Sequence, residues 1–143
     1  MRGFTLVELI VVIVIVGIVA LIAAPRFFAQ AGYDARRFHD TAMSAIRYGQ
    51  KVAIAQHRSV FVVATAGSVA LCFDAACASA VPSPADGGPF TVAAPSGIAI
   101  TAASFSFNAL GQPSPNAQVV LNVSGDATPR QIVVERETGY VHP

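Results

Sequence analysis

Charged residues are scarce in this sequence. Asp, Glu, Lys and Arg make up 12% of the 143 residues, against about 25% in typical soluble chains. The net charge of +1 disfavours nucleic-acid binding by the chain as a whole. Histidine is also rare: His39, His57 and His142 are the three present, and their spacing is not that of metal ligands. We therefore predict no metal site and no cofactor.

The sequence also lacks the patterns that catalysis requires. His57 and Ser59 are close in sequence, but a nucleophile needs a base and an orienting group arranged in space. Gly87 and Gly88 precede Pro89, and the Lys and Ser or Thr of a phosphate-binding loop do not come after them. These absences disfavour an enzyme, and we predict no catalytic residue.

The first two dozen residues, by contrast, are almost wholly apolar. From Phe4 to Ala24 only Thr5, Glu8 and Gly17 interrupt the apolar side chains. A helix of this length measures about 30 Å, which is enough to cross a bilayer. A charged side chain costs about 2.5–3.5 kcal/mol at the middle of a membrane helix and less near its end. Glu8 is the only charge in the segment, so we expect it to have a partner.

Two ordinary interpretations of this segment compete. One is a plain transmembrane anchor in which Glu8 is accidental. The other is a secretory signal peptide. The signal peptide is disfavoured because its basic region would be only residues 1–3, because an acid interrupts the apolar run, and because Pro25 comes directly after the small residues at its end.

The run Gly3-Phe4-Thr5-Leu6-Val7-Glu8 strongly resembles the N-terminal signature of type IV pilins and pseudopilins. The resemblance implies that residues 1–3 are a leader, that prepilin peptidase cuts between Gly3 and Phe4, and that Phe4 is then N-methylated. It also implies that Glu8 meets the amine of Phe4 of a neighbouring subunit. In an apolar bundle each charge is costly alone, and pairing relieves both.

The same resemblance assigns a place in the cell to each part of the chain. Residues 4–25 are expected to cross the bacterial inner membrane once and later to form the filament core, while residues 26–143 form a periplasmic domain. Gly17 and Pro25 match helix-softening positions, because both residue types weaken a helix. The implied partners are other pilins or pseudopilins, prepilin peptidase and the inner-membrane assembly platform.

The distribution of charge conflicts with this orientation. Residues 26–58 contain six basic and two acidic side chains, a net charge of +4, whereas residues 59–143 carry −3. Basic residues directly after a membrane segment favour a cytoplasmic location for the C-terminal part of the chain. We give the pilin signature more weight, because it is the more specific signal.

A helical stripe continues beyond the apolar segment. Small or apolar residues recur three and four positions apart, which is typical of one helix face. The pattern predicts one helix from about Phe4 to His57, whose second half, residues 26–57, packs on the chain's own sheet. The stripe consists of Phe28, Ala31, Ala35, Phe38, Ala42, Ala45, Gly49, Val52 and a polar last member, Gln56.

The pattern changes to that of strands after Ser59. Residues 59–64 and 69–73 are predicted to form a hairpin, and Pro and Gly predict a loop over residues 78–89. The fold class is therefore α+β: a long N-terminal helix packed on an antiparallel sheet within residues 59–142. Further strands are expected at residues 98–100, 104–107, 119–123 and 131–135.

Cys72 and Cys77 are the only cysteines. An even number outside the cytoplasm favours a disulfide, which would contribute about 2 kcal/mol across so short a loop. Two free buried thiols are the alternative. A redox role is disfavoured because the spacing is not C-x-x-C.

The rest of the chain carries softer resemblances. Residues 105–113 and 133–141 resemble minor pilins akin to the type II secretion H pseudopilin and the fimbrial T protein. The cysteine region resembles minor pilins of mannose-sensitive haemagglutinin pili. We expect a structural minor pilin or pseudopilin of a type IV pilus-like or type II secretion filament. The alternative is a DNA-binding minor pilin like fimbrial T, using Arg130 and Arg136, although the paired arginines of that family's chain end are missing here.

Overall fold

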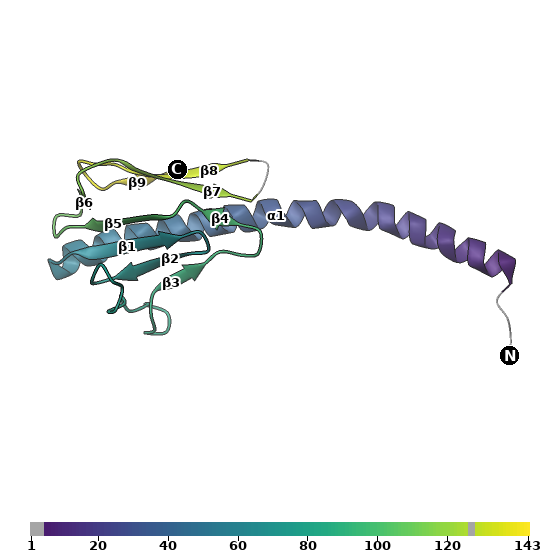
Figure 1. Ribbon diagram of the computed structural model, residues 1–143, viewed down its shortest axis with the longest axis horizontal. Coiled ribbons are helices and arrows are strands. Elements are labelled where there is room, and N and C mark those ends of the chain that lie inside the picture. The colour runs from purple at the N-terminus through teal and green to yellow at the C-terminus, as the bar shows by residue number, and fades with distance from the viewer. Residues whose placement is uncertain (1–4, 126–127) are drawn as a thin grey trace.

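The computed structural model describes residues 5–125 and 128–143, with side chains for all of these except residues 23–31. A single long helix extends from a β-rich head as a shaft (Figure 1). We call residues Leu6–Ile22 of this helix the shaft, and the remainder from residue 32 the head. The predicted α+β class is confirmed.

Helix α1 comprises Leu6–Gln56. Thr5 caps its start, since the Thr5 hydroxyl accepts a hydrogen bond from the Glu8 amide at 3.3 Å. His57 ends it in the left-handed conformation, and its amide donates to the carbonyls of Ala53 and Ile54. The predicted helix is thus confirmed to within two residues at its start and one at its end. It is curved but continuous (Figure 1).

All the strand pairs in the described part of the chain are antiparallel, and they form two sheets. The first sheet has the order β3-β2-β1-β5-β6. Its centre is the predicted hairpin, in which Thr65 pairs with Ser68. The strands of this sheet are β1 (Val60–Thr65), β2 (Ser68–Cys72), β3 (Thr91–Ala93), β5 (Ala103–Phe107) and β6 (Pro113–Ser114).

The second sheet has the order β4-β7-β8-β9. Strand β7 shows the alternation of a strand with one buried face: Leu121 and Val123 are fully buried, while Val120 and Asn122 are exposed. The strands of this sheet are β4 (Ala99–Ile100), β7 (Val119–Ser124), β8 (Arg130–Val134) and β9 (Val141–His142).

The core lies between the second half of α1 and both sheets. The predicted stripe from Ala35 to Val52 is buried, whereas Gln56 is exposed, and Phe28 and Ala31 lie outside the described side chains. Helix and sheet lie close together at Gly49, because a β-carbon there would lie 3.0 Å from the Leu71 side chain.

Two expectations about the sheet need correction. We expected one sheet, but the strands divide into two, both contacting α1. Strands β3, β6 and β9 were also missed. They have two or three residues each, too few to show alternation, and β6 begins with Pro113. Such short segments become strands only when a neighbouring edge is there to pair with them.

Candidate assembly site

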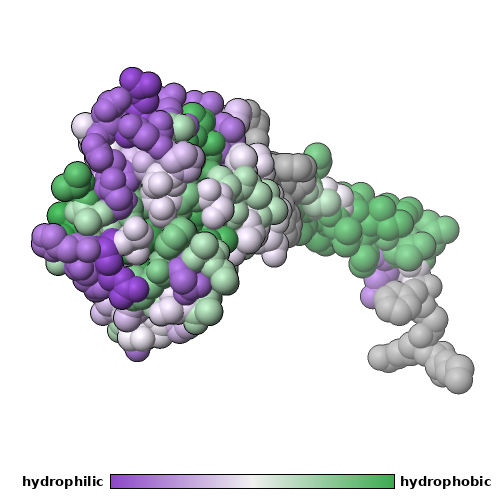
Figure 2. All heavy atoms as spheres, turned by 60° about the vertical axis from the view of Figure 1, so that its left-hand side comes forward, coloured by the Kyte–Doolittle hydropathy of each residue, from purple (hydrophilic) through white to green (hydrophobic). Residues whose placement is uncertain are grey.

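The shaft is apolar on every side. Its fourteen large apolar side chains are between 49% and 79% exposed. Figure 2 shows this apolar surface projecting from a head whose own surface is mixed. A helix that is apolar all round is normally buried in a membrane or among other helices. The composition of the shaft is therefore that of a buried helix, although nothing described in the single chain covers it.

Glu8 lies in the first turn of α1, where the positive end of the helix dipole favours an acid. Its side chain is exposed. No described side chain forms a salt bridge or a side-chain hydrogen bond with its carboxylate. The predicted partner, the amine of Phe4, and the predicted cleavage site after Gly3 lie outside the described residues. The structure thus shows a carboxylate on the apolar shaft that the described residues leave unpaired.

Among the residues described with their side chains, no helical segment combines the length and hydropathy needed to cross a membrane. The predicted membrane segment, residues 4–25, extends beyond these side chains at both ends. The backbone of α1 continues through Gly17 and Pro25, the two predicted softening positions. A β-carbon on Gly17 would meet no described atom within 4 Å, so no described contact in the single chain requires glycine there.

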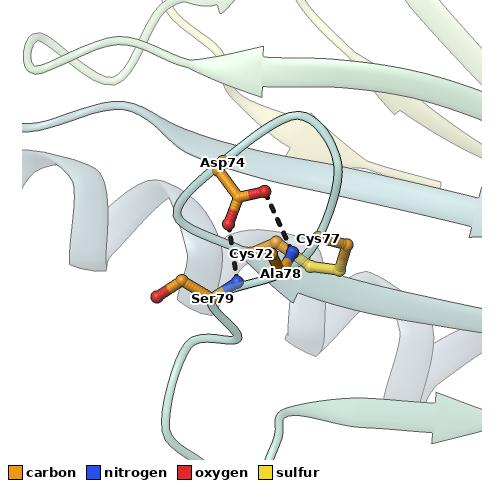
Figure 3. The surroundings of a disulfide bond; sticks show 5 residues. All are labelled: Cys72, Asp74, Cys77, Ala78 and Ser79. Atoms are coloured by element: carbon orange, nitrogen blue, oxygen red, sulfur yellow. Dashed lines mark hydrogen bonds between the residues drawn. A yellow bond between two sulfur atoms is a disulfide. The ribbon is translucent and has the colours of Figure 1, made fainter.

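A disulfide joins Cys72 and Cys77 at the end of β2, in agreement with the cysteine count. Figure 3 shows the carboxylate of Asp74 inside the loop that this bond closes. It accepts hydrogen bonds from the amides of Ala78 at 2.9 Å and Ser79 at 2.6 Å. These backbone donors, that of Ala78 first, lower the pKa of Asp74. The loop is therefore held by two independent links, the disulfide and the carboxylate.

The two arginines of the DNA-binding alternative are not brought together. Arg130 begins β8, whereas Arg136 lies just beyond the end of that strand. Six residues of extended chain separate them by about 20 Å. Arg136 also forms a salt bridge with Glu137, with Nε and Oε1 2.9 Å apart. DNA binding through this pair stays a prediction, and the arrangement gives it no support.

His39 is a buried polar residue that sequence reasoning missed. It is 5% exposed, and its Nε2 lies 2.8 Å from the backbone oxygen of Gln131. Its Nδ1 lies 3.0 Å from Oδ1 of Asp40. The signal was present, since His39 is four residues after Ala35 and three before Ala42 on the predicted stripe. The described residues include no group of three or more metal-ligating side chains that could hold a metal ion.

Comparison with known proteins finds a match to the N-terminal sequence and a match to the fold. Residues 1–24 match the family model described as the prokaryotic N-terminal methylation motif. This motif and the fold together are similar to those of type IV pilins. No curated protein sequence matches the chain.

Among solved structures, the chain is similar in fold to the type IV minor pilin FimU of Pseudomonas aeruginosa, in two crystal forms. One match covers 75% of this chain and 90% of FimU, with 11% identity and a TM-score of 0.56. The other covers 80% and 87%, with the same identity and TM-score. The likeness is therefore one of fold, and it extends over most of both chains.

Proposed function

We propose that this chain is a structural minor pilin-like subunit that is stored in the inner membrane and then assembles into a filament. Prepilin peptidase cuts after Gly3, and the new N-terminus at Phe4 is methylated. Residues 4–25 hold the subunit in the membrane with residues 26–143 in the periplasm. The observation that carries the proposal is the exposed apolar shaft with its single carboxylate, Glu8.

The energetics of the shaft support storage in lipid and later burial in a filament. Burying one large aliphatic side chain is favourable by about 1.5–3 kcal/mol relative to leaving it in water. Fourteen such side chains point in all directions from the shaft. One neighbouring helix would cover only one side of it, so either lipid or a bundle of several shafts must surround it.

Glu8 gives the bundle a register. A carboxylate that moves from the membrane edge into a helix bundle loses water and needs a cation. Cleavage after Gly3 would supply one, because it creates a charged amine at Phe4 beside the apolar segment. A neighbour shifted along the filament axis can present that amine to Glu8. Pairing between subunits therefore fixes how far they are offset.

A type IV pilus fits the sequence better than a type II secretion pseudopilus, although both filaments use such an anchor. We favour the pilus because of the cysteine-closed loop and the Pro-rich loop beside it. The acid at residue 8 also fits a subunit that can accept another subunit above it, unlike the class of secretion pseudopilin that lacks this acid and caps the tip.

Substitution of Glu8 tests the pairing. We expect Glu8→Gln, which keeps the side-chain volume, and Glu8→Ala to remain inserted and processed but to fall at least about tenfold in filaments. Removing one partner of a buried charge pair costs about 3–5 kcal/mol, which is more than enough for that reduction. Quantitative immunoblotting of sheared filaments against membranes measures it.

Val7→Ala is the matched control, because it trims the adjacent shaft residue and keeps Glu8. It should assemble nearly normally. Normal incorporation of both Glu8 variants would contradict the pairing. Intact mass and N-terminal sequencing of the membrane-purified protein test the processing independently. A mature chain that begins with methylated Phe4 is expected, and a chain that retains Met1 would refute the pilin pathway.

A further inference from the structure

The second half of α1 keeps one face uncovered in the head. Both sheets pack on the opposite face of the helix, where the stripe from Ala35 to Val52 is buried. Nothing in the described part of the chain covers the other face, which we call the open face. It consists of the exposed residues Tyr33, Arg36, Arg37, Asp40, Thr41, Ser44 and Lys51.

The open face lies on the same side of α1 as Glu8. The helix is continuous from Leu6 to Gln56, so positions around its axis can be counted at about 3.6 residues per turn. Tyr33 and Ser44 are 25 and 36 residues after Glu8, which is close to seven and to ten whole turns. A neighbouring helix that meets Glu8 in the shaft therefore continues along the open face in the head.

The proposed pairing of Phe4 with Glu8 also fixes which levels of two copies meet. It places each residue of one copy level with the residue four positions later in its neighbour, an offset of about 6 Å of helix rise. At this offset Arg36 of one copy lies level with Asp40 of the next. With no offset, Arg36 would meet Arg36 and Asp40 would meet Asp40, and the like charges would repel each other.

Both charged groups are accessible to a second copy. No acid in the described part of the chain forms a salt bridge with Arg36. The side chain of Asp40 is 63% exposed, although its Oδ1 lies 3.0 Å from Nδ1 of His39. A carboxylate has about four acceptor positions, so this contact is compatible with a guanidinium partner. Arg36, Asp40 and Arg130 line one open hollow of about 360 Å³, which leaves room for a side chain of another copy.

We propose that the open face of α1 docks on α1 of a second copy in the filament, with Arg36 of one copy paired to Asp40 of the next. This inference rests on the proposed function, because it takes its offset from the pairing of Phe4 with Glu8. Each copy uses Arg36 toward one neighbour and Asp40 toward the other. Such a head-to-tail contact repeats without closing and so suits a filament.

The remaining levels of the open face are compatible with this offset. Arg37 of one copy lies level with the uncharged Thr41 of the next. Arg47 lies level with Lys51, which has the same charge. The Arg47 guanidinium is, however, turned toward β9, where it donates from Nε at 3.0 Å and from Nη2 at 2.7 Å to the backbone oxygen of Val141. The offset thus matches one pair of opposite charges without directing two cations at each other.

A contact within one chain is the alternative. Arg36 and Asp40 are also four residues apart on the same helix, a spacing at which opposite charges attract each other weakly. Charge reversals on different copies separate the two cases. A mixture of Arg36→Asp copies and Asp40→Arg copies restores both pairs between alternating neighbours, whereas positions 36 and 40 carry like charges within every chain.

The first experiment measures assembly in cells that produce two differently tagged full-length copies in place of the native one. Sheared filaments are compared with membranes by quantitative immunoblotting. We expect Arg36→Asp or Asp40→Arg alone to fall at least about fivefold in filaments, and the mixture to recover at least about half of the unaltered level. A mixture that assembles no better than either single variant would overturn the contact between copies.

Lys51→Asp is the matched control, because it reverses a charge on the same open face. The residue level with Lys51 in the next copy is Ala55, which has no charge. The control should change incorporation by less than about twofold, and its mixture with Asp40→Arg copies should give no rescue. Equal losses in Lys51→Asp and in the two reversals at positions 36 and 40 would overturn the pairing in favour of a general effect of charge.

Disulfide cross-linking tests the geometry without reversing any charge. Arg36→Cys copies are mixed with Asp40→Cys or Ser44→Cys copies, and the filaments are mildly oxidised. The described residues contain no free cysteine, because Cys72 and Cys77 are bonded to each other. Bridged cysteines need β-carbons about 3.5–4.5 Å apart, so position 40 should give at least about fivefold more cross-linked dimer than position 44. Equal yields at the two positions would overturn the offset.

Three further outcomes separate the possible failures. If the unaltered chain never reaches sheared filaments, the proposed function itself is refuted. If Glu8→Gln lowers incorporation while Arg36→Asp and Asp40→Arg assemble normally, only the contact on the open face is refuted. If the two tagged copies of the unaltered chain are never found in one filament, the neighbour is a different subunit and the assignment to a second copy is wrong.

Discussion

Single side chains attach the last residues of the chain to the head. Arg47 on α1 donates from Nε at 3.0 Å and from Nη2 at 2.7 Å to the backbone oxygen of Val141. On the other side of β9, Nε2 of His142 lies 3.0 Å from Oε1 of Glu135. This contact raises the pKa of His142 and lowers the pKa of Glu135, with their mutual hydrogen bond as the largest cause in each case. The end of the chain is thus held partly by a titratable pair.

The pair predicts a small dependence of stability on pH. The His142 contribution is complete below its ordinary pKa of 6.5 and is lost as the pH rises through the raised value of the folded chain. The Glu135 contribution is present above its ordinary pKa of 4.5 and is lost as the pH falls through the lowered value. The pair should therefore stabilise most between these two pH values.

We expect His142→Gln to lower the Tm more at about pH 6 than at about pH 8.5, because the contact with Glu135 stabilises the fold most while His142 is protonated. Thermal unfolding of both chains across this range, recorded by circular dichroism, measures the difference. A deficit that is the same at both pH values would mean that only the stacking of the His142 ring on Tyr140 was lost.

At the scale of elements, the C-terminal end of α1 holds two turns against each other. The side-chain Nε2 of Gln50 donates to the carbonyls of Gly111 and Thr138, at 2.9 Å and 3.0 Å. Gly139 has a φ of +66°, and a β-carbon there would collide with the Gly111 carbonyl oxygen and come within 2.7 Å of the Gln50 side chain. Gly139 is therefore required both by its backbone conformation and by the space available.

This contact predicts that Gly139→Ala is strongly destabilising. A left-handed non-glycine residue costs about 1–3 kcal/mol, and separation of the two turns would also lose the Gln50 hydrogen bonds. We expect a loss of at least about 2 kcal/mol in the free energy of unfolding by denaturant.

Gly67→Ala is the matched control, since a β-carbon at Gly67 meets no described atom within 4 Å and no positive φ is required there. It should change stability by less than about 0.5 kcal/mol, as surface substitutions usually do. Similar losses in the two variants would contradict the proposed steric cause.

The whole molecule divides into a head with its own core and a shaft whose described side chains contribute nothing to that core. The described core residues begin at Ala35 on α1 and continue to Val141. Every described side chain of the shaft is exposed. The interactions that fold the head are therefore separate from those that would bind it to lipid or to other subunits.

This division predicts that residues 30–143 fold without the shaft. We expect the fragment to be a monomer in size-exclusion chromatography with light scattering, and to unfold cooperatively with heat. The full chain should aggregate without detergent or lipid, because its fourteen exposed apolar side chains remain uncovered. A fragment that is unfolded or lacks a cooperative transition would show that the shaft takes part in folding.

The sequence predicted the long helix and the hairpin well, because both depend on local patterns. The spacing of three and four residues identified the buried face of α1, and the short apolar runs on either side of Gly67 identified β1 and β2. The contacts of His39, Arg47 and Gln50 could not be foreseen from the sequence. The partners of His39 and Arg47 lie 92 and 94 residues away, and the two partners of Gln50 lie 61 and 88 residues away. Local pattern carries no information about which distant backbone oxygen a side chain will meet.

By itself, then, the sequence determined the N-terminal motif, the apolar shaft with Glu8, and a helix that precedes a set of strands. These features are fixed by hydrophobic periodicity and by a short specific signature, which are properties of the chain alone. Only the tertiary structure decided that the strands form two sheets, that the two candidate DNA-binding arginines lie at opposite ends of β8, and that the face of α1 with Arg36 and Asp40 is left uncovered by both sheets. Those outcomes depend on which distant segments pack together, and packing minimises the free energy of the whole head and not of any local segment.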